Sequence, residues 1–341
     1  MDLNLIISFS IACFLVVYGG IQLTRLGDQF EENGISAGFV GTVLLALITS
    51  LPEFVATFSS IFRLDAPQLA LGNIFGSNIF NLSILAFVDL FFIREVLYHK
   101  VDRFVTKSLA IGQMMTVLAL TGIFLNTSGF IITLIVGGKS YLMVSIFTLA
   151  ILIVYILAFK TCTELEEQES PEASENKAVE APRSSTAILS IKFLLFAMVV
   201  VIAGTWLTET CDSISAATGL GKTFIGSILL AFATSLPEAT VCITAMRLHN
   251  YTLVFGNILG SNIFNLFILT LADLGTTKTA ILTIENIELN YITGFTFLLM
   301  SSIILLTLNY TGSRKIIKTI SLSLIAIYLF AYYVMFQMNP V

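Results

Sequence analysis

Long apolar segments decide what this chain can fold into. Ten stretches of mostly apolar residues, each close to the ~20 residues that a membrane-spanning helix needs, follow one another along the sequence. They cover residues 3–24, 38–62, 69–92, 104–125, 140–159, 188–208, 223–246, 252–274, 291–308 and 319–337. The runs are continuous rather than alternating, which argues against a transmembrane barrel. Only 11% of the residues are charged, against about 25% in soluble domains, so we expect an all-α polytopic membrane protein with ten transmembrane helices.

The basic residues predict how these helices are oriented. If the N-terminus lies outside, 13 of the 17 Lys and Arg residues fall in cytoplasmic loops and 4 fall in outside loops. Cytoplasmic loops are enriched in basic residues. We therefore expect a multi-pass protein of the cell (inner or plasma) membrane with both termini outside. The net charge of −5 is the opposite of what a nucleic-acid partner requires.

One strongly polar segment divides the chain. Residues 161–187 contain seven Glu, two basic residues and two Pro, a composition typical of a disordered linker. We expect this acidic linker to be cytoplasmic and to join two units, residues 1–160 and residues 188–341. The charge balance of the chain resides in the linker, so it says nothing about which ions are bound.

Two motifs occur twice in the chain. Residues 41–53 read GTVLLALITSLPE and residues 226–238 read GSILLAFATSLPE, while LGNIFGSNIFNL at 71–82 returns as FGNILGSNIFNL at 255–266. The copies lie five predicted spans apart, and an odd number of spans reverses the orientation across the bilayer. Inverted repeats of this kind are typical of secondary transporters, whose binding sites lie near the membrane midplane. We therefore predict two inverted five-helix repeats.

Each copy of the first motif places an acid beside a proline. Glu53 and Glu238 follow Pro52 and Pro237 and are the only carboxylates well inside a predicted span. Proline removes one helical hydrogen bond and frees a backbone carbonyl, which must then face protein, water or an ion. Acids inside the membrane are costly and indicate a functional site.

Helical spacing brings further oxygen-bearing residues onto the same faces. Carboxylate, hydroxyl, amide and backbone oxygens, with no thiolate or imidazole among them, are the ligands that hard cations prefer. Two carboxylates match the charge of one calcium ion, sodium ions could occupy subsets of the same oxygens, and protons could neutralise the pair instead. The candidate positions are Ala46, Thr49, Ser50 and Glu53, their repeats Ala231, Thr234, Ser235 and Glu238, and the polar stripes Asn73, Ser77, Asn81 and Asn257, Ser261, Asn265.

At these motifs the sequence resembles the cation/calcium exchanger superfamily, and in particular its prokaryotic sodium/calcium exchanger branch. TSLPE at 49–53 and 234–238, with GNIFGSNIFN at 72–81 and GNILGSNIFN at 256–265, resembles the two repeats of that family. The resemblance implies alternating access, in which the first and sixth spans slide over a rigid core. It also implies transported Ca²⁺ and Na⁺, and no cofactor.

The resemblance implies a role for each matching position. Glu53 and Glu238 would be shared calcium and sodium ligands, and Asn81 and Asn265 would line the central site. The remaining oxygens would come from the hydroxyls and carbonyls of Thr49 and Thr234, the hydroxyls of Ser50, Ser235, Ser77 and Ser261, and the carbonyls of Ala46 and Ala231. Many family members carry Asp where this chain has Asn265, which leaves two carboxylates instead of three. The proton-coupled branch has GNAxE in place of TSLPE, and this favours sodium coupling.

Several readings of the same residues stay open at this point. A calcium/proton antiporter would use the same site with a different coupling ion. A calcium-permeable channel is disfavoured because the chain has an inverted repeat and no subunit-symmetric filter. An intramembrane hydrolase could use two carboxylates for acid–base chemistry, but no histidine lies near them, so we do not expect an enzyme. The expected partners are the lipid bilayer and the transported ions.

Overall fold

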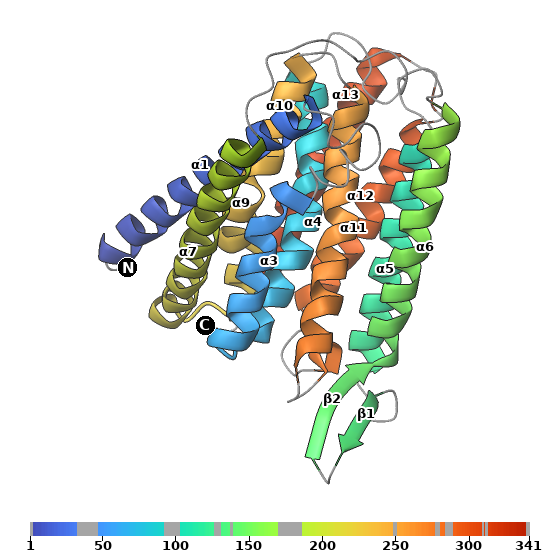
Figure 1. Ribbon diagram of the computed structural model, residues 1–341. Coiled ribbons are helices and arrows are strands. Elements are labelled where there is room, and N and C mark those ends of the chain that lie inside the picture. The colour runs from blue at the N-terminus through green and yellow to red at the C-terminus, as the bar shows by residue number, and fades with distance from the viewer. Residues whose placement is uncertain are drawn as a thin grey trace.

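The computed structural model describes residues 3–32, 47–91, 103–125, 131–136, 139–169, 186–247, 251–276, 280–283, 289–308, 310 and 313–338. The chain is nearly all helical (Figure 1). The helices of the first half are α1 (Leu3–Glu32), α3 (Leu51–Phe58), α4 (Pro67–Phe91), α5 (Arg103–Leu125) and α6 (Ile146–Glu169). Those of the second half are α7 (Thr186–Thr218), α8 (Lys222–Ile225), α9 (Ala231–Thr234), α10 (Leu236–Arg247), α11 (Tyr251–Gly275), α12 (Leu289–Leu308) and α13 (Arg314–Met338). Shorter turns are the π-helical segments η1 (Ser59–Arg63) and η4 (Gly226–Leu230) and the 3₁₀ turn η5 (Ile281–Thr283).

The apolar composition of the helices agrees with a membrane protein. Within the described residues, seven helices are long and apolar enough to cross a bilayer, and the bent pair that runs from Lys222 to Arg247 makes an eighth. Two of the ten predicted spans are not among these eight. The span at 38–62 lies partly outside the described residues, and the helical part of 140–159 is a shorter apolar helix, Ile146–Ala158. The number of ten therefore stays a prediction.

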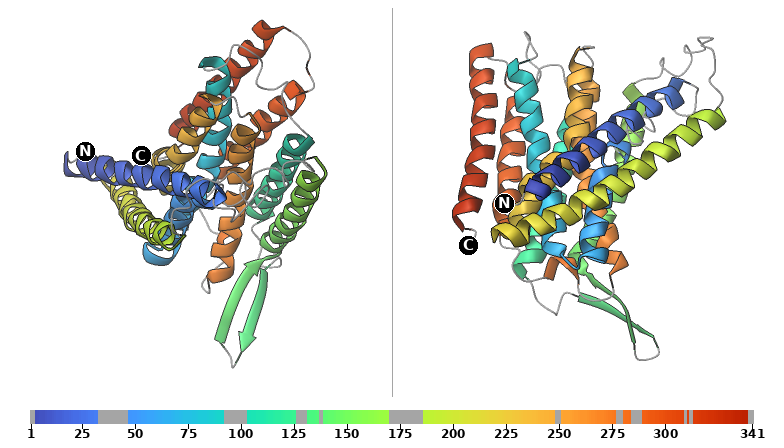
Figure 2. Two further views of the ribbon diagram at one scale, coloured as in Figure 1. Left: turned by 45° about the horizontal axis from the view of Figure 1, so that its top comes forward. Right: turned by 90° about the vertical axis from the view of Figure 1, so that its left-hand side faces the viewer.

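Helices α4 and α11 form the centre of the bundle. In each of them 78% of the most apolar stretch is buried, against 22% in α1, α7 and α13. Helices α1 and α7 pack against each other and cross the remaining helices at a steep angle (Figure 2, right). The inner helices carry the polar motifs, so the residues of interest lie in the most buried part of the molecule.

The structure corrects the all-α expectation in one place. Strands β1 (Ile131–Val136) and β2 (Lys139–Ser145) pair antiparallel, with Ile131 opposite Ser145, and form a hairpin that projects from one end of the bundle (Figure 1). The predicted span 140–159 is therefore wrong over residues 140–145. A Gly-Gly pair at 137–138 follows a run rich in β-branched residues, IITLIV at 131–136. This is a hairpin signal that the apolar character of the segment concealed.

The acidic linker also begins later than its composition predicts. Helix α6 continues to Glu169 and α7 begins at Thr186, so residues 161–169 and 186–187 are helical. The segment from 161 to 169 contains four Glu, one Gln and one Leu among its nine residues, and these residue types have good helix propensity. Residues 170–185 lie outside the described residues.

Candidate cation-binding site

The two TSLPE motifs break their helices in the same way. Ser50 has φ −86° and ψ 10°, and Ser235 has φ −90° and ψ 7°. Both serines precede a Leu-Pro pair, and the missing N–H of the proline prevents a regular helix there. In the second repeat the helix bends by 42° between Thr234 and Leu236. The glutamates therefore lie in the first turn of a new helix, Glu53 in α3 and Glu238 in α10.

Each glutamate accepts hydrogen bonds from one serine of its own repeat and one of the other. Oε1 of Glu53 accepts from Ser77 at 3.4 Å and from Ser235 at 2.7 Å. Oε1 of Glu238 accepts from Ser261 at 3.3 Å and from Ser50 at 3.2 Å. The two carboxylates and all four serines are fully buried. The structure thus brings both repeats together around one pair of acids.

The threonines of the motif connect the broken helices to the central ones. Thr49 donates to Oδ1 of Asn257 at 3.3 Å, and Thr234 donates to Oδ1 of Asn73 at 3.2 Å. The Thr234 hydroxyl also lies 3.3 Å from the carbonyl of Ala231, which accepts the N–H of Ser235 as well. Ala46 lies outside the described residues. Every other predicted site residue is buried in this region.

Asn78 and Asn262 complete the network, although the spacing argument passed over them. Nδ2 of Asn81 donates to Oδ1 of Asn262 at 2.9 Å, and Nδ2 of Asn265 donates to Oδ1 of Asn78 at 3.0 Å. Asn78 and Asn262 also donate to each other's backbone carbonyls, at 3.3 Å and 3.4 Å. Both lie one residue beyond Ser77 or Ser261, off the polar stripe. The signal that could have found them is the GSN triplet present in both motif copies.

Within this network, four buried carboxylate and amide oxygens have no hydrogen-bond partner among the described residues. They are Oε2 of Glu53, Oε2 of Glu238, Oδ1 of Asn81 and Oδ1 of Asn265. A buried oxygen without a partner is costly, and such atoms commonly indicate an ion or water that the protein holds there. Two carboxylates and two amides can supply oxygen ligands to a hard cation.

The other acids of the described chain have partners outside this network. Asp89 accepts from Arg314 and Ser321, and Asp273 accepts the backbone N–H of Ile281. Glu209 and Asp212 lie within α7 and pair with Arg63 and Lys222. Three of these acids are held by ion pairs and Asp273 by a backbone hydrogen bond, which indicates structural roles rather than cation ligation.

Glycines allow α4 to approach η4 of the second repeat closely. A Cβ atom on Gly76 would overlap the backbone of Ser227, and one on Gly226 would overlap the carbonyl of Leu69. Small residues let helix backbones meet inside a membrane. This close contact holds α4 against η4, directly before the broken helix that carries Glu238.

Residues 4–161 and 189–338 match the family described as sodium/calcium exchanger protein. The chain belongs to this family. Membership supports cation exchange across a membrane as its activity, carried out by a transporter rather than an enzyme. Residues 162–188, between the two matched segments, nearly coincide with the acidic linker predicted at 161–187.

Individual relatives agree with the family assignment. The chain is 24% identical over 257 residues to a membrane protein of Methanocaldococcus jannaschii, covering 75% of this chain and 76% of the relative. It is 24% identical over 262 residues to the inner membrane protein YrbG of Escherichia coli, covering 76% and 75%. The sodium/calcium exchanger MaX1 of Methanosarcina acetivorans is 36% identical over 70 residues, which are 20% of each chain.

Solved structures share the fold over almost the whole chain. The sodium-calcium exchanger NCX_Mj soaked with 2.5 mM Na⁺ and 0.1 mM Ca²⁺ superposes with a TM-score of 0.60 at 21% identity, over 97% of this chain and 98% of that one. The same exchanger soaked with zero Na⁺ and Ca²⁺ gives a TM-score of 0.58 at 20% identity, over 98% and 99%. The chain therefore has the membrane fold of that exchanger.

Proposed function

We propose that this protein is a secondary-active antiporter that exchanges calcium for sodium by alternating access at the buried site between its two repeats. The observation that supports this most directly is the set of four unpartnered oxygens, two carboxylate and two amide, contributed symmetrically by both motif copies. The proposed ligands are Glu53, Glu238, Thr49, Thr234, Ser50, Ser235, Ser77, Ser261, Asn81, Asn265, Ala46 and Ala231.

The hydrogen bonds of the proposed side-chain ligands favour cation binding because they consume the donors of these ligands and leave acceptors, whereas Nδ2 of Asn73, a neighbour of Thr234, has no partner among the described residues. Each serine hydroxyl gives its proton to a carboxylate and keeps oxygen lone pairs for an ion. The amide groups of Asn81 and Asn265 direct their N–H donors to Asn262 and Asn78, so only their carbonyl oxygens remain. A cation meets oxygen lone pairs in such a site, whereas an anion would require N–H or O–H donors.

The charge of the site suits alternating occupancy by the two ions. Two ionised carboxylates carry a charge of −2, which one Ca²⁺ or two Na⁺ would balance. Calcium takes about 6–8 oxygens at about 2.3–2.6 Å in a flexible shell, and the proposed set contains enough oxygens for it. Because both ions use the same carboxylates, the binding of one excludes the other, and this competition couples their movements.

Asn78 and Asn262 have a positioning role in this proposal. Oδ1 of each accepts the amide N–H of the ligand asparagine from the other repeat. Nδ2 of Asn78 and Nδ2 of Asn262 donate to each other's backbone carbonyl, which fixes both side chains. Without this bond the ligand amide could rotate by half a turn and present N–H₂ to the ion. The pair thereby selects the oxygen-inward orientation of Asn81 and Asn265.

The tilted helices α1 and α7 are the proposed moving elements. A Cβ on Gly20 of α1 would lie 2.6 Å from the ring of Pro237, and one on Gly204 of α7 would lie 3.1 Å from Val55. Each tilted helix thus passes the broken helix of the other repeat at a glycine. Sliding of the pair along these contacts would open the site to one side of the membrane and then to the other.

The proposed topology follows the sequence. The protein would be a multi-pass protein of the cell membrane with ten spans, arranged as inverted repeats over residues 1–160 and 188–341. Both termini would lie outside, and the acidic linker at 161–187 would lie in the cytoplasm. Cysteine labelling from each side of sealed cells tests this arrangement. Labelling of a cysteine placed in the linker from the outside would contradict it.

The decisive experiment applies the two ion gradients separately. Purified protein in proteoliposomes should take up calcium when sodium is loaded inside and absent outside, and should not do so under a pH gradient alone. Vesicles containing Glu53→Gln protein provide the control for leak. Uptake driven by the pH gradient without sodium would identify the alternative calcium/proton antiporter, and single-channel currents in a planar bilayer would identify a channel.

A further inference from the structure

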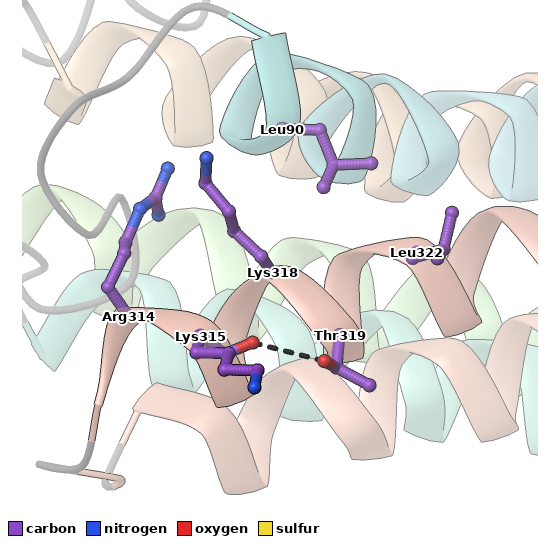
Figure 3. Close-up of a pocket in the computed structure, with 6 residues that line it drawn as sticks. All are labelled: Leu90, Arg314, Lys315, Lys318, Thr319 and Leu322. Carbon is purple, nitrogen blue, oxygen red and sulfur yellow. Dashed lines mark hydrogen bonds between the residues drawn. The ribbon is translucent and has the colours of Figure 1, made fainter.

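A second polar feature lies where the C-terminal end of α4 meets the first turns of α13. A pocket of about 480 Å³ is lined by Leu90 at the end of α4 and by Arg314, Lys315, Lys318, Thr319 and Leu322 on the first turns of α13 (Figure 3). Among the described residues, its lining includes three basic side chains and no acidic one. None of these residues takes part in the network around Glu53 and Glu238.

Two basic groups of the pocket lie on the side that faces α4. In Figure 3 the guanidinium of Arg314 and the ammonium of Lys318 both project from α13 toward the helix that carries Leu90, whereas the ammonium of Lys315 points away. Arg314 is held in place by Asp89, with Nη1 donating to Oδ1 at 2.8 Å and Nη2 donating to the backbone carbonyl at 2.8 Å. Asp89 also accepts from Ser321 at 2.7 Å. The guanidinium is therefore rigidly placed, and Lys318 adds a positive charge that no acid of the described residues neutralises.

The pocket is amphipathic along the direction of α13. The basic groups lie at the start of the helix, while Leu322 lies about two turns further along it and Leu90 faces it across the gap (Figure 3). Since α13 is a candidate membrane span, its first turn lies nearer the membrane surface than Leu322 does. The order from basic to apolar thus matches the order from headgroup to acyl chain in a lipid.

We propose that this pocket binds an anionic phospholipid, with its phosphate at Arg314 and Lys318 and its acyl chain along Leu90 and Leu322. Basic pockets between transmembrane helices on the cytoplasmic side bind anionic headgroups, and the sequence predicts that this end of α13 is cytoplasmic. The apolar end of the pocket favours a lipid over a soluble anion, because inorganic phosphate has nothing to place against two leucines. The bound lipid would bridge α4, which carries ligands of the exchange site, and α13.

Native mass spectrometry of the full-length protein in detergent tests the proposal. The protein is titrated with phosphatidylglycerol and, separately, with phosphatidylcholine of the same acyl chains. We expect phosphatidylglycerol to bind more tightly than phosphatidylcholine and Lys318→Gln to weaken its binding by roughly fivefold. Lys107→Gln is the matched control, because Lys107 is an exposed lysine on α5 that does not line the pocket, and it should bind like the wild type.

Three results would overturn the assignment. Equal affinity for the two lipids would show that charge is not recognised. An equal loss in Lys107→Gln and Lys318→Gln would show a diffuse surface attraction rather than a site. Displacement of phosphatidylglycerol by millimolar inorganic phosphate would identify the pocket as a site for a soluble anion.

Discussion

The hydroxyl of Ser235 donates a hydrogen bond of 2.7 Å to Oε1 of Glu53, although the two residues lie 182 positions apart in the chain. Ser50 makes the reciprocal bond to Glu238. Each carboxylate is therefore completed by the repeat to which it does not belong. These bonds between the repeats tie the two broken helices into one core, over which α1 and α7 are proposed to slide.

Replacing either buried glutamate should remove exchange. Glu53→Gln and Glu238→Gln each halve the charge available to a divalent cation while keeping the shape of the side chain, so we expect calcium uptake in proteoliposomes to fall to the level of protein-free vesicles. Glu209→Gln is the matched control, because Glu209 pairs with Arg63 on the surface, where an ion pair contributes about 0–1 kcal/mol. Sodium-driven uptake that persists in both buried variants would contradict the assigned site.

Restoring an acid at position 265 should change the ion balance of the site. In Asn265→Asp a third carboxylate replaces the side-chain amide whose Oδ1 has no partner among the described residues. A carboxylate attracts cations more strongly than an amide does. We expect the variant to stay active and to show a changed sodium dependence or a changed calcium concentration for half-maximal uptake. Initial uptake rates measured over a series of both ions check this, and a profile that matches the wild type would show that residue 265 does not tune the site.

The positioning asparagines should affect apparent affinity more than maximal rate. Asn78→Ala leaves Nδ2 of Asn265 without its acceptor, and an unsatisfied buried donor costs about 1–3 kcal/mol. The calcium concentration for half-maximal uptake should rise about 5- to 150-fold, with the same effect in Asn262→Ala.

Ser83→Ala is the control for the asparagine variants. Ser83 lies on the same helix as Asn78, but among the described residues its hydroxyl bonds only to the carbonyl of Phe80, so its removal should leave the half-maximal concentration unchanged. A purely structural role for Asn78 would instead lower the melting temperature and the amount of active protein at an unaltered half-maximal concentration.

Close packing of α4 against η4 should not tolerate a single added methyl group. A Cβ on Gly76 would overlap the Ser227 backbone, and overpacking of this kind costs about 1–3 kcal/mol, so Gly76→Ala should lower the melting temperature in detergent. Gly112→Ala is the control, since its Cβ would lie 3.4 Å from the ring of Phe297, an ordinary contact. Equal melting temperatures for the two variants would show that the backbones separate at no cost.

Much of the helical architecture can be predicted from local sequence patterns. Apolar run length predicts a membrane protein because a helix must satisfy its own backbone across the hydrocarbon, and most of the predicted helices have counterparts in the structure. The same reasoning is wrong at 140–145, because an apolar run of strand length looks like the beginning of a helix until its pairing partner is known. The polar composition of residues 161–187 likewise predicted a linker, whereas the helix propensity of residues 161–169 extends α6 to Glu169.

By itself, the sequence determined that two copies of one polar motif lie in an apolar chain and that Glu53 and Glu238 are equivalent. Both facts follow from residue patterns within short segments, so they can be recognised in the sequence alone. Only the tertiary structure decided which serine reaches which carboxylate, and that Asn78 and Asn262 hold the ligand amides. Those contacts depend on how α4 and α11 pack against the broken helices of both repeats. Packing between segments nearly 200 residues apart is set by the whole bundle, and no spacing rule within one helix encodes it.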